Sequence, residues 1–333
     1  MGVYIIAEAG VNHNGSLDLA LKLCDEAKET GADAIKFQTW KTEKLITKYV
    51  RMADYQQGNM NVDNMSQYEM LKKLELSYEE FRMIKNYCDQ IGLNFLSTPD
   101  EEESLAFLVS LNLDIIKIGS GEITNIPYLR KVGSTNKKII LSTGMSTIGD
   151  VDRAFSTIKC AGAKDISLLH CTTAYPCPMS EVNLHVISTL KHAFQCPVGY
   201  SDHTLGIEVA IAAVALGAVI IEKHFTLDRQ MNGPDHLASL DPDNFKQMVN
   251  SVRNIENALG NYIKEPNEKE KQIAQVVQKG IVARIPIRKG EPYTENNITV
   301  KRSSEGLSAA YWDLVIGLKA QNDYSTDDPI SLQ

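Results

Sequence analysis

Eight short, continuously apolar segments recur from the start of the chain to about Gly260, and each is followed by a helix-like pattern. Since they are rich in β-branched residues, these segments suit strands that are buried on both faces. The intervening stretches, such as Leu17–Thr30, repeat apolar residues at spacings of three and four, which is typical of amphipathic helices. Eight such units predict an α/β fold, a (β/α)₈ TIM barrel. The predicted strands are Tyr4–Ala7, Ala34–Phe37, Asn94–Leu96, Ile115–Ile118, Lys138–Leu141, Ile166–Leu169, Pro197–Gly199 and Val219–Ile221.

A doubly wound parallel sheet is the alternative fold for this alternation. Its dinucleotide-binding form carries a G-x-G-x-x-G turn after the first strand, and nothing similar follows Tyr4–Ala7 here. The barrel is therefore the better prediction. Ser77 and Glu80 have the spacing of a capping box and predict the start of a helix.

The pattern changes after Gly260. Residues 263–278 are rich in charge, contain Pro266 and predict a linker or an exposed helix start. Beyond them come short alternating segments with turns, Ile281–Ile287 and Ile298–Lys301 among them, which predict a small β-rich domain. We therefore expect a barrel domain over 1–262, a linker over 263–278 and a second domain over 279–333.

The formal net charge of −8 argues against nucleic acid or an anionic membrane as the main partner. The start of the chain resembles a first strand, not a signal peptide or membrane anchor. The six cysteines are scattered without a Cys-x-x-Cys pair, which favours reduced thiols and a cytoplasmic protein. Cys171 follows a predicted strand, where a small buried residue is a better interpretation than a nucleophile.

Nearly every predicted strand ends in polar residues. In a (β/α)₈ barrel the carboxyl ends of the strands meet at one mouth, where active sites lie. Buried polar groups are costly without partners, so this convergence predicts a site. The residues concerned are Glu8 with Asn12-His13-Asn14, Lys36 and Gln38, Ser97-Thr98, Lys117 with Ser120-Gly121-Glu122, Ser142-Thr143-Gly144, Thr172-Thr173 with Tyr175, Ser201-Asp202-His203, and Glu222 with His224.

Two lysines and several hydroxyl groups in this ring predict an anion pocket. Lys36 and Lys117 supply positive charge, while hydroxyls can donate hydrogen bonds to a phosphate and a carboxylate. Two other interpretations stay open for the lysines: a Schiff-base role, or ordinary ion pairs with Glu8 or Glu122. The hydroxyl donors are Thr98, Ser120, Ser142 and Ser201.

Two histidines, His203 and His224, end consecutive predicted strands and can meet over the mouth. Two imidazoles with room for water and substrate oxygens suit a divalent metal of the Mn²⁺ type, and hydrogen-bonded imidazoles are the alternative. His185 and His192 lie on a predicted helix, away from this mouth. His13 lies in a Gly- and Asn-rich loop, where contact with a ligand is left open.

The same segments resemble the bacterial sialic acid synthases and their relatives that make legionaminic acid, over essentially the whole chain. The matching motifs are Ala7-Glu8-Ala9-Gly10-Val11-Asn12-His13-Asn14-Gly15, Lys36-Phe37-Gln38-Thr39, Ser97-Thr98-Pro99, Lys117-Ile118-Gly119-Ser120-Gly121-Glu122, Ser142-Thr143-Gly144-Met145, His170-Cys171-Thr172-Thr173-Ala174-Tyr175-Pro176, Tyr200-Ser201-Asp202-His203-Thr204, Glu222-Lys223-His224-Phe225-Thr226 and Gly233-Pro234-Asp235-His236. The resemblance implies a (β/α)₈ barrel followed by an antifreeze-like (SAF) domain. It also implies a domain-swapped homodimer, in which the small domain caps the partner's barrel.

The resemblance further implies roles for individual residues. His203 and His224 hold a divalent metal, Mn²⁺ first and Mg²⁺ or Co²⁺ as alternatives. Glu8 and Glu122 position water or the substrates. Phosphoenolpyruvate is bound by Lys36, Thr98, Lys117, Ser120, Ser142, Thr173 and Ser201, and the sugar by Gln38, Asn59 (or Asn61), Tyr175, Asp235 and, from the other subunit, Arg302.

The implied reaction joins phosphoenolpyruvate to an N-acetylated hexosamine, with addition of water and release of phosphate. We expect N-acetylmannosamine as the acceptor, which gives N-acetylneuraminic acid. The alternatives are a 6-deoxy diacetamido hexose giving N,N'-diacetyllegionaminic acid, a Schiff-base aldolase or lyase, and a carbohydrate- or ice-binding protein. The family's usual Lys-Arg-Pro-Gly loop is Lys301-Arg302-Ser303-Ser304 here, so the turn after Arg302 is expected to be looser.

Overall fold

The computed structural model describes residues 2–52 and 65–332 of the chain, which divides into two compact units, Met1–Gly260 and Asn261–Gln333. The first unit contains an eight-stranded parallel sheet with the ladder order β3-β2-β1-β8-β7-β6-β5-β4. The end strands β3 and β4 also pack against each other, which brings the sheet round into a nearly closed barrel. The strands are β1 (Tyr4–Gly10), β2 (Ala34–Thr39), β3 (Asn94–Pro99), β4 (Ile115–Ile118), β5 (Lys138–Ser142), β6 (Ile166–Cys171), β7 (Val198–Asp202) and β8 (Ile220–His224).

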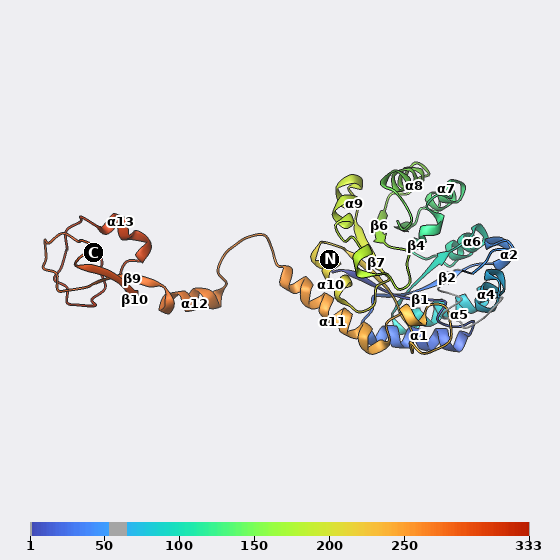
Figure 1. Ribbon diagram of the computed structural model, residues 1–333, viewed down its shortest axis with the longest axis horizontal. Coiled ribbons are helices and arrows are strands. Elements are labelled where there is room, and N and C mark those ends of the chain that lie inside the picture. Colours follow the sequence, from blue (N-terminus) through green and yellow to red (C-terminus); the bar gives the residue numbers. More distant parts are fainter. Residues whose placement is uncertain (1, 53–64, 333) are drawn as a thin grey trace. The chain divides into compact units, whose positions relative to one another are not determined.

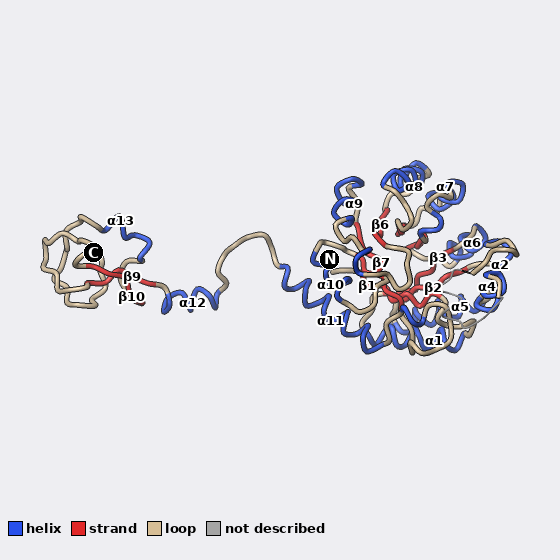
Figure 2. Tube along the Cα trace, viewed as in Figure 1, coloured by secondary structure: helices blue, strands red, loops and turns tan. Residues whose placement is uncertain are grey.

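Helices surround these strands, as Figures 1 and 2 show, and the predicted TIM-barrel architecture is confirmed. The largest apolar cluster fills the space between strands and helices, with Ile5, Leu23, Phe37 and Phe245 fully buried in it. The helices are α1 (Leu17–Thr30), α2 (Thr42–Leu45), α4 (Gln67–Leu74), α5 (Tyr78–Ile91), α6 (Glu102–Ser110), α7 (Ile126–Gly133), α8 (Ile148–Cys160), α9 (Val186–Phe194), α10 (Glu208–Ala215) and α11 (Pro242–Leu259).

A second, smaller apolar cluster seals the interior of the barrel itself. Because side chains alternate along a strand, every second residue points to the barrel axis. The residues of this apolar cluster come from seven strands. The eighth strand, β7, contributes Gly199 to the same layer. A methyl group at Gly199 would lie only 2.4 Å from the carbonyl oxygen of Ile220 and 2.7 Å from Cδ2 of Leu169, so the layer has no room for a larger residue. The cluster consists of Ile6, Ala34, Leu96, Ile140, Leu169 and Ile220, with Tyr4 and Ile115 packed against it.

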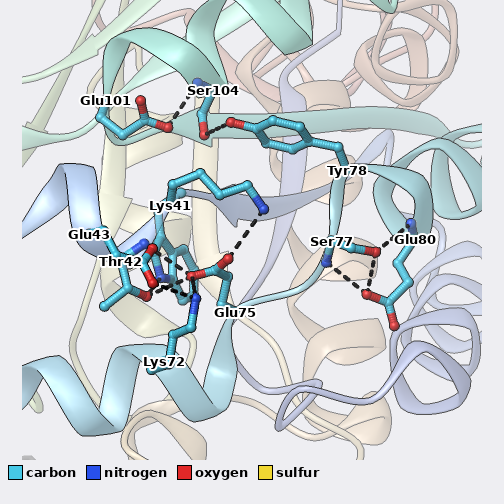
Figure 3. Close-up of polar contacts among 11 residues, drawn as sticks. Lys41, Thr42, Glu43, Lys72, Glu75, Ser77, Tyr78, Glu80, Glu101 and Ser104 are labelled. Atoms are coloured by element: carbon cyan, nitrogen blue, oxygen red, sulfur yellow. Dashed lines mark hydrogen bonds and ion pairs between the residues drawn. The ribbon is translucent and has the colours of Figure 1, made fainter.

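A polar clamp joins the two described ends of the long segment between β2 and α5 (Figure 3). The carboxylate of Glu75 accepts hydrogen bonds from the backbone N–H and the hydroxyl of Thr42, at 3.0 and 2.8 Å, and from Lys41 and Lys72, both at 3.2 Å. Beside it, the predicted capping box of α5 is present: Ser77 and Glu80 exchange side-chain and backbone hydrogen bonds. The clamp therefore ties the start of α2 to the stretch between α4 and α5.

The first helix of the second unit is α12 (Glu268–Val277), which lies within the segment expected as a linker, and a small β-rich fold follows it. Strands β9 (Lys279–Ala283) and β10 (Ile298–Arg302) pair antiparallel, and the short helix α13 (Trp312–Val315) follows. This unit has its own apolar core, formed by Ile281, Ala283, Ile287, Tyr293, Ile298, Val315, Ala320, Tyr324 and Ile330.

Replacing Gly199 by Ala should destabilise the protein by about 1–3 kcal/mol, because the added methyl group overpacks the interior layer. Thermal or urea unfolding of the full chain measures the change. Gly149→Ala is the matched control, since the nearest atom to an added methyl group there is 3.8 Å away and the site lies at the start of α8. Equal stability losses in the two variants would contradict the packed-layer argument.

Candidate active site

The mouth of the barrel is lined by residues that lie two and four positions further along each strand than the apolar layer inside the barrel. The first polar level consists of Glu8, Lys36, Thr98, Lys117, Ser142, Cys171, Ser201 and Glu222, and the next includes Gln38, Asp100, Gly119, Thr173, His203 and His224. These residues line one cavity of about 180 Å³, together with Ser120, Gly121, Met145 and Tyr175. Strand alternation thus places most of the predicted site residues in one space.

Two buried lysines and two buried carboxylates form the floor of this cavity. Lys36 Nζ lies 2.7 Å from Glu8 Oε2 and 3.8 Å from Glu222 Oε2, while Lys117 Nζ lies 3.6 Å from Glu222 Oε1. All four side chains are 7% exposed or less. Burying an isolated charge is very costly, so the two cations and two anions have to compensate each other here.

Hydroxyl groups complete the surroundings of the lysines. Lys36 donates to Thr98 Oγ1 at 3.2 Å and Lys117 donates to Ser142 Oγ at 2.7 Å. Ser201 Oγ donates to Glu222 Oε1 at 2.8 Å. Cationic groups beside rotatable hydroxyls, at the closed end of a cavity, can bind the oxygens of an anion such as phosphate or carboxylate.

The two carboxylates of the floor differ in their protonation. Burial raises the pKa of Glu8, only partly opposed by Lys36. Burial also opposes ionisation of Glu222, but Lys117 and Lys36 together outweigh it and hold its pKa below the usual value. Glu222 is therefore the fixed negative charge between the lysines, and of these two carboxyl groups Glu8 is the one that can exchange a proton near neutral pH.

His203 and His224 lie close together at the upper level, with ring centroids 5.6 Å apart. His203 Nδ1 is 2.7 Å from the carbonyl oxygen of Thr172, which leaves its Nε2 facing Ser201 Oγ at 3.4 Å. His224 Nδ1 is buried and has no hydrogen-bond partner among the described residues. Burial lowers the pKa of both imidazoles and favours their neutral form, which is the form that binds metals.

This pair of imidazoles fits a partly protein-held metal site. Each ring has at least one nitrogen without a backbone hydrogen bond, Nε2 in His203 and Nδ1 in His224, and the two rings share the cavity. The described residues contain no group of three or more His, Cys, Asp or Glu side chains arranged to hold an ion. Any metal here would therefore need oxygens from water or substrate for the rest of its coordination shell.

The residues expected to contact a sugar surround these histidines. The ring of Tyr175 lies 4.2 Å from the ring of His203 and 5.7 Å from that of His224, measured between centroids. Gln38 Nε2 donates to Glu8 Oε1 at 3.2 Å. Asp235 is buried, does not line the cavity as delimited above, and lies 3.9 Å from His224; burial raises its pKa to about 6.

Two further expected site residues are not among those that line this cavity. Glu122, at the end of a single 3₁₀ turn, accepts a hydrogen bond from Asn125 at 2.6 Å and does not line the cavity. Arg302 is exposed at the end of β10, in the second unit. Asn59 and its alternative Asn61 lie outside the described residues.

The structure also shows the environments of His13, Cys171 and the turn after Arg302, for which the sequence raised expectations. His13 is fully buried beside Phe37 and does not line the cavity. Cys171 is buried in the cavity wall, 3.2 Å from Ser120 Oγ. The turn after Arg302 is held by Ser303, whose hydroxyl donates to the carbonyl of Glu305 and accepts from its N–H. The expected loosening of this turn is thus offset by side-chain hydrogen bonds.

Sequence reasoning did not assign a role to Glu222 or to Asp100. Glu222 stands two positions before His224, and this spacing on a strand was the available signal that both point into the mouth. Asp100 follows the strand β3, where two-residue alternation from Thr98 again places it at the mouth. Burial raises the pKa of Asp100 to about 7.

Fold and site together define a (β/α)₈-barrel protein with two buried lysines at the bottom of its mouth and a pair of imidazoles above them, followed by a small β-rich unit. The chain belongs to the NeuB family, whose sequence pattern matches residues 23–264, and a SAF domain matches residues 278–333. The resemblance to the sialic acid synthases and their relatives is therefore confirmed.

Among similar proteins, N,N'-diacetyllegionaminic acid synthase from Campylobacter jejuni is 47% identical over 328 residues, 98% of each chain. The protein of the same name from Legionella pneumophila is 44% identical, over 98% of this chain and 92% of its own. A crystal structure of the N-acetylneuraminic acid synthetase from Leptospira borgpetersenii, in complex with citrate, has a TM-score of 0.73 and is 34% identical. It covers 83% of this chain and 91% of that one. Within residues 2–52 and 65–332, no helix combines the length and apolar character that crossing a membrane requires.

Asp100→Asn should stabilise the unliganded protein more at pH 8 than at pH 5. The raised pKa means that folded Asp100 keeps a proton up to about pH 7, whereas the unfolded chain releases it near pH 4. Wild-type stability therefore falls as pH rises through this window, and the amide removes that loss. We expect a difference of roughly 1 kcal/mol at pH 8, allowing for partial solvent screening. Urea unfolding at both pH values measures it, and a stability difference that does not change with pH would contradict the assignment.

Proposed function

We propose that this chain condenses phosphoenolpyruvate with the open-chain form of a 6-deoxy diacetamido hexose and releases phosphate, which gives N,N'-diacetyllegionaminic acid. The observation that carries the proposal is the pair of buried lysines facing one carboxylate at the closed end of the mouth. Such a floor can accept an anion by exchanging the ion pairs of Lys36 and Lys117 with Glu222 for contacts with the ligand.

The choice of sugar rests on the comparisons. The two relatives named for N,N'-diacetyllegionaminic acid synthesis are more similar to this chain than the N-acetylneuraminic acid synthetase of known structure. N-acetylmannosamine, the acceptor expected from the sequence, remains the second candidate because that synthetase shares the fold over most of the chain. The Schiff-base alternative is less suited to Lys36, whose ion pairs raise its pKa despite its burial. Burial lowers the pKa of Lys117, so a borohydride trap with pyruvate is the test for that lysine.

In this proposal the floor of the cavity binds phosphoenolpyruvate. Lys36 and Lys117 contact its phosphate and carboxylate. Hydroxyls that donate hydrogen bonds to the same oxygens fix its orientation. The donors are Thr98, Ser120, Ser142, Thr173 and Ser201, each of which lines the cavity.

The acceptor sugar lies above phosphoenolpyruvate, toward the histidines. Gln38 and Tyr175 contact it from the cavity wall, and Asp235 contacts it from beside His224. Asn59 and the partner's small domain, through Arg302, complete the sugar site in the proposed domain-swapped homodimer. A divalent metal, Mn²⁺ first and Mg²⁺ or Co²⁺ as alternatives, would be held by His203 and His224 and would polarise the sugar aldehyde as a Lewis acid.

The bonds change as follows. The electrons of the C2=C3 double bond of phosphoenolpyruvate form the bond from C3 to the aldehyde carbon, and the aldehyde oxygen gains a proton. Water adds to the electron-poor C2 and loses a proton, after which the C2–O bond breaks and phosphate leaves. Glu8 handles the proton from water, because it lines the cavity and has a raised pKa, whereas Glu122 is held by Asn125. Lys36 and Lys117 stabilise the negative charge on the departing phosphate.

Phosphate release from phosphoenolpyruvate tests the reaction directly. With Mn²⁺, we expect release to depend on the 6-deoxy diacetamido hexose and to exceed that with N-acetylmannosamine at least tenfold in kcat/KM. A chelator should abolish release with either sugar. Faster release with N-acetylmannosamine would reassign the acceptor, and trapping of a pyruvate adduct by borohydride would replace the mechanism by the Schiff-base one.

His203→Ala should lose nearly all synthesis, about a hundredfold or more in kcat, while the protein stays folded and still binds phosphoenolpyruvate. Phosphate release and direct phosphoenolpyruvate binding measure the two effects separately. His192→Ala, at an exposed position of α9, is the control and should keep wild-type rates. Substantial synthesis by His203→Ala in excess Mn²⁺ would overturn the metal assignment.

A further inference from the structure

A fully buried ion pair lies on the outer face of the barrel wall, directly behind the two imidazoles. Lys223 Nζ is 2.8 Å from Asp202 Oδ2, and both side chains are completely inaccessible to solvent. Each residue immediately precedes one of the histidines in sequence, since Asp202 adjoins His203 and Lys223 adjoins His224. Strand alternation sends the histidines into the mouth and the ion pair to the opposite side.

Hydrogen bonds connect this ion pair to the backbone next to His203. Asp202 Oδ1 accepts from the N–H of Thr204 at 2.9 Å and from its hydroxyl at 2.8 Å. Lys223 Nζ also donates to the carbonyl oxygen of Thr204 at 2.6 Å. The residues on both sides of His203 are therefore tied to the residue that precedes His224.

The ion pair joins two residues that are directly opposite each other on neighbouring strands. Asp202 pairs with Lys223 in the parallel ladder of β7 and β8, one step beyond the pairing of Ser201 with Glu222. A slip of one residue along either strand would reverse the direction of every side chain and remove an imidazole from the mouth. A directional ion pair resists such a slip, whereas apolar contacts permit sliding.

Stability alone is a poor reason for this pair. Removing two charges from water costs several kcal/mol per ion, and apolar residues of similar size often give equal or greater stability in such positions. Burial lowers the pKa of the Lys223 ammonium group, although its attraction to Asp202 opposes this effect. The lowered pKa reflects the free-energy cost of burying the charge. The pair is better explained by what it fixes than by what it stabilises.

We propose that Asp202 and Lys223 are positioning residues that fix the separation and direction of the His203 and His224 imidazoles for binding a divalent cation. The proposal rests on the metal site of the proposed function, and it assigns to the pair no contact with substrate or metal.

The test measures binding of Mn²⁺ alone to the metal-free full-length protein, by electron paramagnetic resonance or calorimetry. The variants are Asp202→Leu with Lys223→Met, which replaces the pair by apolar residues, and His203→Ala. We expect the apolar pair to keep the wild-type melting temperature and to raise the Kd for Mn²⁺ about tenfold or more, as the loss of groups that orient metal ligands does. His203→Ala should abolish site-specific binding.

Thr39→Val with Ser97→Ala is the matched control. These two hydroxyls form a buried hydrogen bond of 2.7 Å between β2 and β3, on the same outer face but away from the histidines. This control should leave the Kd for Mn²⁺ unchanged. If the apolar pair does not fold, Asp202→Asn is used instead, since its amide oxygen can still accept from Thr204 while the charge attraction to Lys223 is lost.

The outcomes separate the two levels of the argument. Wild-type Mn²⁺ affinity in the folded Asp202/Lys223 variants, with binding lost in His203→Ala, overturns the positioning role and leaves the metal site standing. Equal Mn²⁺ binding by wild type and His203→Ala overturns the metal site itself. An equal loss of affinity in the Thr39/Ser97 control also overturns the positioning role, because any buried polar pair in the wall would then have the same effect.

Discussion

The alternation of side chains along eight parallel strands is the constraint on which the rest of this structure depends. At one level the inward positions are apolar and close the barrel, with Gly199 filling the place where a side chain does not fit. Two residues further along each strand, the inward position lines the cavity, so side chains from all eight tilted strands meet in one space. The site is therefore a polar cavity that lies directly on the apolar layer. Lys36 and Lys117 lie at its bottom, where water is scarce and electrostatic interactions are strong.

Charge balance follows from that burial. Glu222 stays ionised because it faces both lysines, while Glu8 is pushed toward its protonated form. The environment thus gives two glutamates of one cavity different protonation states, which suits one to fix charge and the other to transfer a proton. On the other side of the wall, the buried charges of Asp202 and Lys223 compensate each other in the same way. Ionic pairs on both faces of β8 hold the same strand in place.

Much of this was predictable from particular residues. The eight apolar runs predicted all eight strands, although the predictions for β1, β2, β3, β5, β6, β7 and β8 ended too early. They ended where the apolar residues ended, for example at Leu169, whereas β6 continues to Cys171. Apolar character reports burial against other side chains. A strand that lines a polar mouth keeps its backbone ladder while losing that signal. The sequence placed Glu222 at the mouth beside His224 but gave it no role, because its ion pairs with Lys36 and Lys117 depend on distances across the barrel.

The sequence alone determined the order of strands and helices, the polar character of the strand ends and the family resemblance, because these depend on local pattern and on motifs that are contiguous in the chain. Only the tertiary structure decided which of the polar residues share a cavity. It placed Glu8, Lys36, Lys117 and Glu222 within ionic contact, while it left Glu122 with Asn125 and buried His13 beside Phe37. Distances between residues so far apart in sequence are set by closure of the barrel. Burial and pKa follow from those distances, and no local pattern encodes them.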